Sequence, residues 1–355
     1  MKKITINEIA KIANVSRGTV DRVVNNRGYV AEDKLKLIQQ IIKDLDFTPN
    51  THGRNLALSK SLKIAIILPI YSVGEYFESI VKATEIAGKN YMPFGLQINY
   101  YYFDIYDLSK FSIIEKIIFN EDYNAIITTQ PQNKTITAFL KKCHTKNIPY
   151  VLLGTHDIKF DSLTNLGQDA KQSGRLAGKL INYGQENLAK YIVFNIFNEQ
   201  NINQNIVSRI EGFKAFFKEN KIKKINVEIV NISINDPQLK SKIKEHLITL
   251  TKYDGIFIPN SRSHLVAELL EKTQKVRFLG FDLINANVKY LKSGVIDFLI
   301  NQKPFEQGYK GVETLYRFLA THQEPQKNIN IPVEVITIEN FANNDETSFI
   351  EKTEK

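Results

Sequence analysis

The chain has 355 residues, of which 43% are hydrophobic and 24% are charged, a composition typical of a globular protein with two or three domains. Its single cysteine, Cys143, excludes an internal disulfide and favours a reducing compartment. The N-terminus has lysines but no unbroken apolar stretch after them, and the longest apolar runs, such as residues 64–70, are too short to cross a bilayer. We therefore expect a cytoplasmic protein without a membrane segment.

Positive charge is concentrated near the N-terminus. Residues 1–60 contain eleven Lys and Arg against six Asp and Glu, whereas the rest of the chain contains 36 against 32. Such a concentration suits a polyanionic partner such as nucleic acid, although many small helical domains are also mildly basic.

Residues 4–46 have the pattern of three short helices. Thr5 and Glu8 fit a capping box at the start of the first helix, and Ser16 fits the N-cap of the second. The positions expected to face inward are Ile6, Ile9, Ile12 and Ala13, then Val20, Val23 and Val24, and finally Leu35, Ile38, Ile42 and Leu45 in a third helix over about 32–45. Two short helices joined by a tight turn and braced by a third form the helix-turn-helix arrangement.

In a helix-turn-helix the second helix lies in the major groove, and outward residues near its start reach the base edges. These outward residues are Arg17, Gly18, Asp21 and Arg22. An arginine can donate two hydrogen bonds to guanine, which is worth about 1–3 kcal/mol of discrimination. The short polar residues placed to contact phosphate are Ser16, Thr19 and Asn25. The alternative interpretation is a three-helix unit that docks onto another protein.

From residue 62 onward, apolar strand-like runs alternate with amphipathic helical segments. The runs are residues 63–70, 96–103, 124–129, 149–153, 190–197, 225–232, 254–259, 276–281, 296–301 and 333–338. Strands that are apolar on both faces, each followed by a helix, indicate parallel sheets in an α/β architecture. This number of strands exceeds one typical open sheet, so two similar lobes are expected.

These patterns predict a helix-turn-helix head, a hinge, a two-lobed core and a flexible tail. The predicted ranges are 1–47 for the head, 48–61 for the hinge, 62–341 for the core and 342–355 for the tail. Within the core, the first lobe is expected to take about 62–164 and 300–325, and the second about 165–299 and 326–341.

The N-terminal motifs resemble the DNA-binding head and hinge of the lactose-repressor (LacI/GalR) family. "TINEIAKIANVSRGTVDRVVNNRGYV" is followed by "FTPN" and "NLALSKS", in the order of the family pattern V-S-x-x-T-V-S-R-V-x-N, Y-x-P-N and a hinge with L-A. The resemblance implies that Arg17, Gly18 and Arg22 read bases. It implies backbone contacts by Thr5, Ser16, Thr19, Asn25 and Asn50. It also implies that Leu56, next to Ala57, wedges into the minor groove and kinks the DNA.

The head departs from the family pattern at two positions. Asp21 stands where the family usually has serine, and a carboxylate there would repel phosphate; it can instead accept from a cytosine amino group or pair with an arginine. Gly18 supplies no side chain, so Arg17 and Arg22 are expected to carry more of the specificity. The operator sequence therefore does not follow from the family pattern.

The resemblance extends to the core, and implies a type I periplasmic-binding-protein-like fold with a ligand in the crevice beyond the strand ends. The implied ligand-binding residues are Tyr76, Phe77, Thr155, His156, Arg209, Asn260, Asp282 and Gln302. Each has a structural alternative, such as core packing for the two aromatic residues, a salt bridge for Arg209 or a helix cap for Asp282. "LLGTHD" and "NSRS" lack acidic residues that are usual in the family, so a modified, acidic or larger glycan-derived ligand stays open beside a plain sugar.

The predicted function is a DNA-binding transcription regulator whose operator affinity depends on a small carbohydrate-like effector between the lobes. Repression is the family's commoner mode. We expect a homodimer on a palindromic double-stranded site, because two-fold protein symmetry requires one. Tetramerising heptads are absent from residues 340–355.

No enzyme activity, metal or cofactor is expected. The six histidines are scattered, one cysteine cannot build a thiolate metal site, and "QSGRLAGK" lacks the ending of a P-loop. The alternative is a carbohydrate-active enzyme, such as a sugar kinase, fused to a helix-turn-helix. It should show a phosphate-binding glycine loop and a catalytic aspartate motif.

Overall fold

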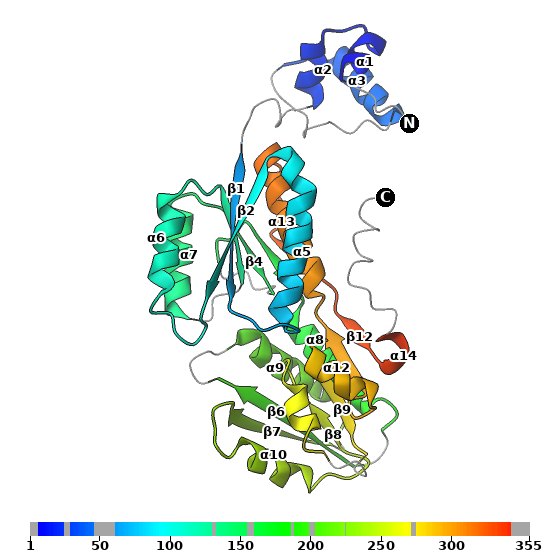
Figure 1. Cartoon of the computed structure of the whole chain (residues 1–355). Coiled ribbons are helices and arrows are strands. Elements are labelled where there is room, and N and C mark those ends of the chain that lie inside the picture. The colour runs from blue at the N-terminus through cyan, green and yellow to red at the C-terminus, as the bar shows by residue number, and fades with distance from the viewer. Residues whose placement is uncertain are drawn as a thin grey trace. The chain divides into compact units, whose positions relative to one another are not determined.

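The computed structural model describes residues 6–24, 29–45, 61–129, 133–154, 160–185, 188–198, 203–223, 225–270 and 275–341 (Figure 1). The chain divides into two units, Met1–Lys60 and Ser61–Lys355. We call the first the head and the second the core, and describe each by itself.

The described part of the head consists of α1 (Ile6–Ile12), α2 (Arg17–Val24) and α3 (Glu32–Asp44). These helices share a small apolar centre in which Ile9, Val20 and Ile38 are fully buried. The backbone N–H of Thr19 donates to Ser16 Oγ at 3.1 Å, so Ser16 is the N-cap of α2, as predicted. The expectation for Ile12 is wrong: it is 58% exposed, because the buried stripe of α1 continues through Ala10 and Ala13 instead.

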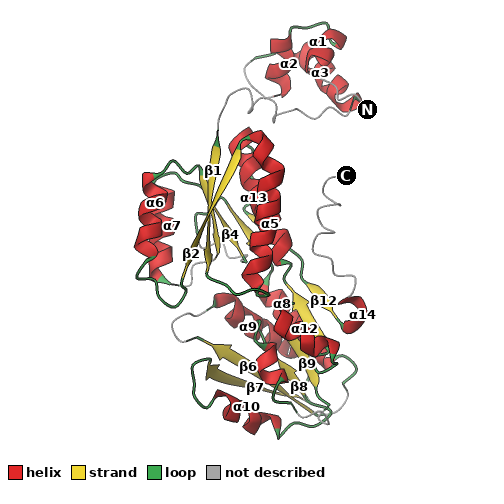
Figure 2. Cartoon of the chain, in the orientation of Figure 1, coloured by secondary structure: helices red, strands yellow, loops and turns green. Residues whose placement is uncertain are grey.

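The core contains two mostly parallel sheets, each covered by helices on both faces (Figure 2). The first sheet has the order β11-β5-β4-β3-β1-β2 and the second the order β12-β10-β9-β8-β6-β7. Every described neighbour pair is parallel except β10 with β12. Residues 64–68 of β1 are buried on both faces, as a central parallel strand requires. The predicted α/β class is confirmed.

The strands of the first sheet are β1 (Leu62–Pro69), β2 (Leu96–Phe103), β3 (Ala125–Thr129), β4 (Tyr150–Leu153), β5 (Thr164–Gly167) and β11 (Asn328–Asn330). Those of the second are β6 (Ala189–Phe197), β7 (Ile225–Ser233), β8 (Gly255–Phe257), β9 (Arg277–Phe281), β10 (Phe298–Asn301) and β12 (Glu334–Ile336). We call each sheet with its covering helices a lobe.

In the first lobe, α5 (Tyr76–Tyr91) and α13 (Pro304–Thr321) cover one face, and α6 (Phe111–Asn120) and α7 (Lys134–Thr145) cover the other. In the second lobe, α8 (Ala170–Asn182) and α9 (Gln204–Glu219) cover one face. The other face carries α10 (Leu239–Leu247), α11 (Ser263–Ala267) and α12 (Asn285–Lys292). Two short elements, η1 (Met92–Phe94) and α14 (Ile338–Phe341), complete the described core.

The chain crosses between the lobes after β5, β10 and β11. The predicted lobe limits are wrong in three places. The predicted limit at 164/165 falls inside β5, which pairs with β4 in the first sheet. The range 326–341, predicted to belong to the second lobe, contains β11, which pairs with β5 in the first sheet. The limit at 299/300 cuts β10, which belongs to the second sheet. Because β5 and β11 are short and rich in polar residues, they leave no apolar run in the sequence.

Helices α8 and α9 approach each other closely at two glycines. A Cβ atom on Gly174 would lie 2.0 Å from the carbonyl oxygen of Arg209, and one on Gly212 would lie 1.9 Å from that of Lys171. Since no side chain fits at these distances, the glycines allow α9 to rest against α8 and set the position of Arg209.

Replacing Gly174 with alanine should lower the free energy of unfolding of the core by about 1–3 kcal/mol, the usual cost of overpacking. Equilibrium denaturation followed by circular dichroism measures this change. The control is Gly18→Ala in α2, where the nearest atom is Ser16 Oγ at 3.7 Å and the core transition should not move. A core equally stable with either substitution would contradict the close approach of α8 and α9.

Candidate functional site

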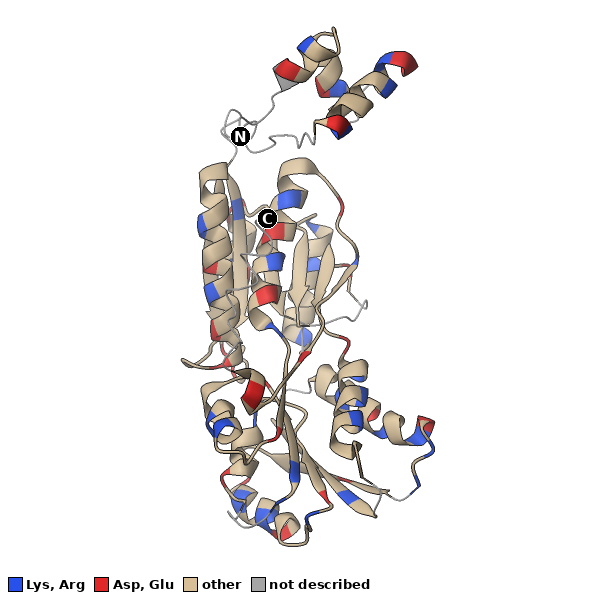
Figure 3. Ribbon diagram, turned by 90° about the vertical axis from the view of Figure 1, so that its right-hand side faces the viewer, with Lys and Arg blue, Asp and Glu red and all other residues tan. Residues whose placement is uncertain are grey.

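Helix α2 carries several of the residues predicted to contact DNA, from its first residue Arg17 to Arg22 in its last turn. Arg17, Gly18 and Arg22 are exposed, while Thr19 and Asp21 are half-buried. Gly18 and Arg22 are four residues apart and so lie on one face of the helix. Both basic and acidic residues occur on the described head helices, and they do not form a uniformly basic patch (Figure 3). Any contact of this surface with DNA therefore depends on the positions of individual side chains. The predicted contacts Thr5, Asn25, Asn50, Leu56 and Ala57 lie outside the described residues.

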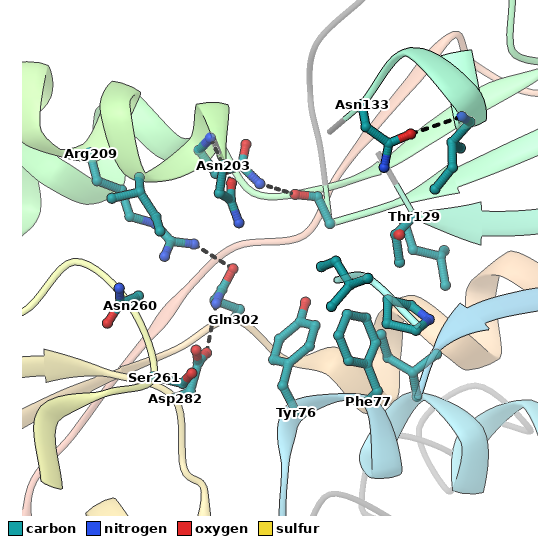
Figure 4. A pocket seen from close by; sticks show the side chains of 18 of the residues that line it. Tyr76, Phe77, Thr129, Asn133, Asn203, Arg209, Asn260, Ser261, Asp282 and Gln302 are labelled. Atoms are coloured by element: carbon teal, nitrogen blue, oxygen red, sulfur yellow. Dashed lines mark hydrogen bonds between the residues drawn. The ribbon is translucent and has the colours of Figure 1, made fainter. Parts of the chain in front are cut away.

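A cavity of about 190 Å³ lies between the two lobes of the core (Figure 4). Its walls come from the carboxyl ends of strands in both sheets, which is where parallel α/β sheets place ligands. The structure brings six predicted ligand residues together around it: Tyr76, Phe77, Arg209, Asn260, Asp282 and Gln302. The other two, Thr155 and His156, lie outside the described residues.

The two walls of this cavity differ in polarity. The first-lobe wall includes the apolar residues Pro69, Phe77, Ile80, Phe103, Ile105, Ile136 and Leu153. The second-lobe wall includes the polar residues Asn203, Asn205, Arg209, Asn260, Ser261, Asp282 and Gln302. The rings of Tyr76 and Phe77 meet edge to face, with centroids 5.3 Å apart. A ring compound with an apolar face and several hydroxyl groups matches these walls.

Gln302 joins a buried cation to a buried anion. Arg209 is 3% exposed, and its guanidinium carbon lies 3.9 Å from the ring centroid of Phe281. Arg209 Nη2 donates to Gln302 Oε1 at 2.5 Å, and Gln302 Nε2 donates to Asp282 Oδ1 at 2.6 Å. Arg209 Nη1 donates to the carbonyl oxygen of Pro259 at 2.7 Å. The partners that hold Arg209 in place are thus neutral oxygens, rather than the salt bridge considered as its structural alternative.

Asp282 enters the cavity directly after β9. Its backbone has φ 68°, a left-handed conformation that aspartate tolerates better than most residues and that turns the chain sharply. The N-cap of the following helix α12 is Ile284, without a side-chain capping bond, so Asp282 does not serve as that cap. Burial raises the pKa of Asp282 to about 6, against the opposing effects of Arg209 and Gln302.

The other titratable groups of the cavity keep their ordinary state at neutral pH. Burial lowers the pKa of Arg209 to about 10, so the guanidinium stays charged. Burial also raises the pKa of the Tyr76 hydroxyl, which therefore remains protonated and able to donate. The cavity thus offers a fixed cation, a hydroxyl donor and a carboxylate that titrates close to neutrality.

Asn260 and Asn287 shape the loops that follow β8 and β9. Asn260 Nδ2 donates to the carbonyl oxygen of Ile196 at 2.9 Å, and Asn260 Oδ1 accepts from the backbone N–H of Arg262 at 3.1 Å. Asn287, which the sequence patterns do not single out, is fully buried. Its Nδ2 contacts the carbonyl oxygens of Ser261, Phe281 and Asp282. One amide therefore holds both loops.

Five further polar residues line the cavity that the sequence analysis does not predict: Thr129, Asn133, Asn203, Asn205 and Ser261. Thr129 ends β3, and Asn133 caps α7 through its side-chain oxygen. Asn205 lies at the start of α9 and donates from Nδ2 to the carbonyl oxygen of Gly154 at 2.6 Å, which links the lobes. The strand-end rule, applied to every strand instead of only to family motifs, would have found the first two.

Two negative findings hold for the described ranges. They contain no group of three or more His, Cys, Asp or Glu side chains placed to bind a metal ion. They also contain no helix that is both long enough and apolar enough to span a membrane.

The pKa of Asp282 predicts a pH-dependent stability of the core. The pKa of this carboxyl is about 6 in the folded chain and 3.8 in the unfolded chain. The folded chain therefore binds this proton more tightly, and protonation favours folding below pH 4. That contribution is lost as the pH rises through about 6. The free energy of unfolding of the wild type, taken relative to that of Asp282→Asn, should therefore fall by about 2–3 kcal/mol between pH 4 and pH 7. Denaturant titrations at each pH measure it, and a constant difference would contradict the shift.

Comparison with protein families divides the chain in the same way as its structure. Residues 5–50 match the bacterial regulatory proteins of the lacI family, and residues 64–324 match the periplasmic binding protein domain. ExuR of Bacillus subtilis, named as an HTH-type transcriptional repressor, is 30% identical over 60% of this chain and 56% of its own length. Catabolite control protein B of Bacillus subtilis is 41% identical over 27% of this chain and 33% of its own length. The chain thus spans about half of the length of the first relative and a third of the length of the second.

Other similarities cover more of the chain. The ribose operon repressor of Lactococcus lactis is 24% identical over 94% of this chain and 97% of its own length. An Agrobacterium vitis solute binding protein with bound α-D-tagatopyranose has a TM-score of 0.67 at 22% identity, over 81% of this chain and 99% of that one. These matches confirm the family predicted from the head motifs. The chain belongs to the lacI family of bacterial regulatory proteins, with a periplasmic binding protein domain as its core.

Proposed function

We propose that this protein is a transcriptional repressor that binds double-stranded DNA through its head and a carbohydrate-like effector between the lobes of its core. One observation carries the proposal: a single chain joins a lacI-type head to a cavity whose walls come from two separate lobes. The names of its relatives, including the ribose operon repressor, support the same role. Such a protein acts where the chromosome lies, in the cytoplasm.

On the DNA side, α2 reads the major groove with Arg17 and Arg22. Both side chains are exposed, Arg17 at the first position of α2 and Arg22 in its last turn, and Val20 anchors this helix to the head. Ser16 and Thr19 contact the phosphate backbone. Two copies of the chain pair on a palindromic operator, and their Leu56 side chains enter the minor groove together.

On the ligand side, the polar second-lobe wall binds hydroxyl groups and the aromatic pair of Tyr76 and Phe77 contacts an apolar face of the ring. Arg209 and Asp282 supply one donor group and one acceptor group of opposite charge. A solute binding protein of the same fold holds a sugar, which supports a sugar or sugar derivative as the effector.

A ligand in the cavity lies next to the segments that connect the lobes. Gln302 lies where the chain crosses after β10, and Gln168 lies where it crosses after β5; their side chains are 2.7 Å apart. A ligand that contacts Arg209 or Asp282 therefore acts on the residues about which the lobes turn. We propose that the resulting change in lobe angle alters the spacing of the paired hinges, with a coupling of about 1–3 kcal/mol.

The alternative, a sugar kinase fused to a helix-turn-helix, has less support. The match to the periplasmic binding protein domain extends over residues 64–324, which is the region that a kinase would need for its own domain.

Selection from random duplex DNA with the full-length protein should yield a palindromic site, because two heads bind it in two-fold symmetry. A sugar that raises the melting temperature of the core should change the affinity for that site about 5- to 150-fold. The control is Phe77→Ala, which should keep DNA binding without ligand and lose the response to the sugar. If every ligand that binds the core leaves operator affinity unchanged, the proposed coupling is wrong.

Replacing Arg22 with alanine should weaken binding to the selected site about 10- to 100-fold and relax its sequence preference, since a lost base contact costs about 1–3 kcal/mol. The matched control is Lys43→Ala on α3, which removes the same charge from an exposed position. It should weaken binding to all sequences alike. Fluorescence anisotropy with the selected site and a scrambled duplex separates the two effects. Equal losses on both duplexes for Arg22→Ala would refute a base-reading role.

A further inference from the structure

The cavity between the lobes continues outward into a larger one of about 820 Å³. The two cavities share eight lining residues, among them Tyr76, Asn203 and Ser261, so they form one continuous space. The inner cavity, at about 190 Å³, is smaller than the usual pocket of about 300–1,000 Å³ for a ligand of moderate size. A ligand confined to it would leave most of the available space empty.

The outer cavity is not the gap of two lobes held apart. The lobes already touch at two places: the backbone N–H of Asn285 donates to the carbonyl oxygen of Gly74 at 3.2 Å, and Asn205 Nδ2 donates to that of Gly154 at 2.6 Å. A Cβ on Gly74 would lie 2.4 Å from Asn285 Nδ2, so this contact is tight. The outer cavity therefore exists while the lobes are in contact.

The floor of the outer cavity carries an amide pair where the sheet would otherwise be apolar. Along β6, Tyr191 and Val193 face the α9 side of the second sheet, and Asn195 is the next residue on that side. In β7 the corresponding residues are Val227, Ile229 and Asn231. Asn195 and Asn231 are paired in register, and Asn195 Nδ2 donates to Asn231 Oδ1 at 2.8 Å. On this side of the sheet, both strands thus change from apolar side chains to an asparagine at the same register position, and both asparagines line the outer cavity.

The remaining lining of the outer cavity combines aromatic and aliphatic side chains with polar groups that bond within the protein. Tyr71, Tyr106 and Phe197 contribute rings. The charged groups have partners within the protein: Glu75 Oε2 accepts from the backbone N–H of Ser72 at 3.0 Å, and Arg262 Nη1 donates to the carbonyl oxygen of Ile196 at 2.6 Å. Amides that both donate and accept, beside aromatic rings, suit the hydroxyl groups and the apolar face of a neutral sugar ring.

We propose that the outer cavity is a second saccharide subsite, and that the effector has at least two linked rings. One ring lies between Tyr76, Arg209 and Asp282, and the next lies against Asn195, Asn231 and the rings of the outer cavity. This proposal rests on the proposed function, because it assumes a saccharide in the inner cavity, and it specifies the size of the effector.

Isothermal titration of the full chain with matched sugars tests this. The panel holds glucose, galactose, fructose and N-acetylglucosamine, together with sucrose, maltose, cellobiose, lactose and chitobiose. At least one disaccharide should bind ten-fold or more tightly than each of its constituents. Asn231→Ala should raise the Kd of that disaccharide to the level of the tighter constituent and leave the constituent's own Kd unchanged. The matched control, Asn226→Ala, replaces an exposed asparagine of the same strand outside the cavity lining and should change neither value.

The outcomes separate the two proposals. If at least one monosaccharide binds and no disaccharide of the panel binds more tightly than its own constituents, the second subsite is overturned and the proposed function still stands. The same holds if Asn231→Ala keeps the full advantage of the disaccharide. If no sugar of the panel binds, the saccharide assignment of the whole cleft fails, and the second subsite fails with it.

Discussion

A guanidinium and a carboxylate, both buried and joined through Gln302, determine the chemistry of the cleft. Neither charge would be tolerated so far from water without hydrogen-bonding partners, and Pro259, Gln302 and the ring of Phe281 supply them for Arg209. The carboxyl of Asp282 is less well compensated, which is why its pKa lies near 6. The site is therefore charged but held rigidly, as selective recognition of a polar ligand requires.

The topology of the core places these groups within reach of one another. Both sheets have the same succession of strands, and the carboxyl ends of the two sets face one space. Arg209, Asp282 and Gln302 arise from separate segments of the chain, yet each follows or adjoins the end of a strand in the second sheet. The crossing segments run past the same space, and their residues Gln168 and Gln302 are in contact there.

The fold by itself does not separate a regulator from a solute receptor. The solute binding protein from Agrobacterium vitis shares the fold of this core. What differs is the N-terminal unit, where a short helix with exposed arginines adds a second binding surface to the same polypeptide. Function in this chain thus depends on the union of two units rather than on either fold alone.

Periodicity in the sequence by itself determined the helices of the head, the α/β class and ten of the twelve strands that the structure describes, because apolar runs and capping residues are local signals. The resemblance to the family, rather than periodicity, implied six residues that line the cleft. Only the tertiary structure decided the membership of β5 and β11, the role of Asn287, the polarity of the two walls and the extent of the outer cavity. These depend on segments that are distant in the sequence and meet only when both sheets have formed, so no local pattern records them.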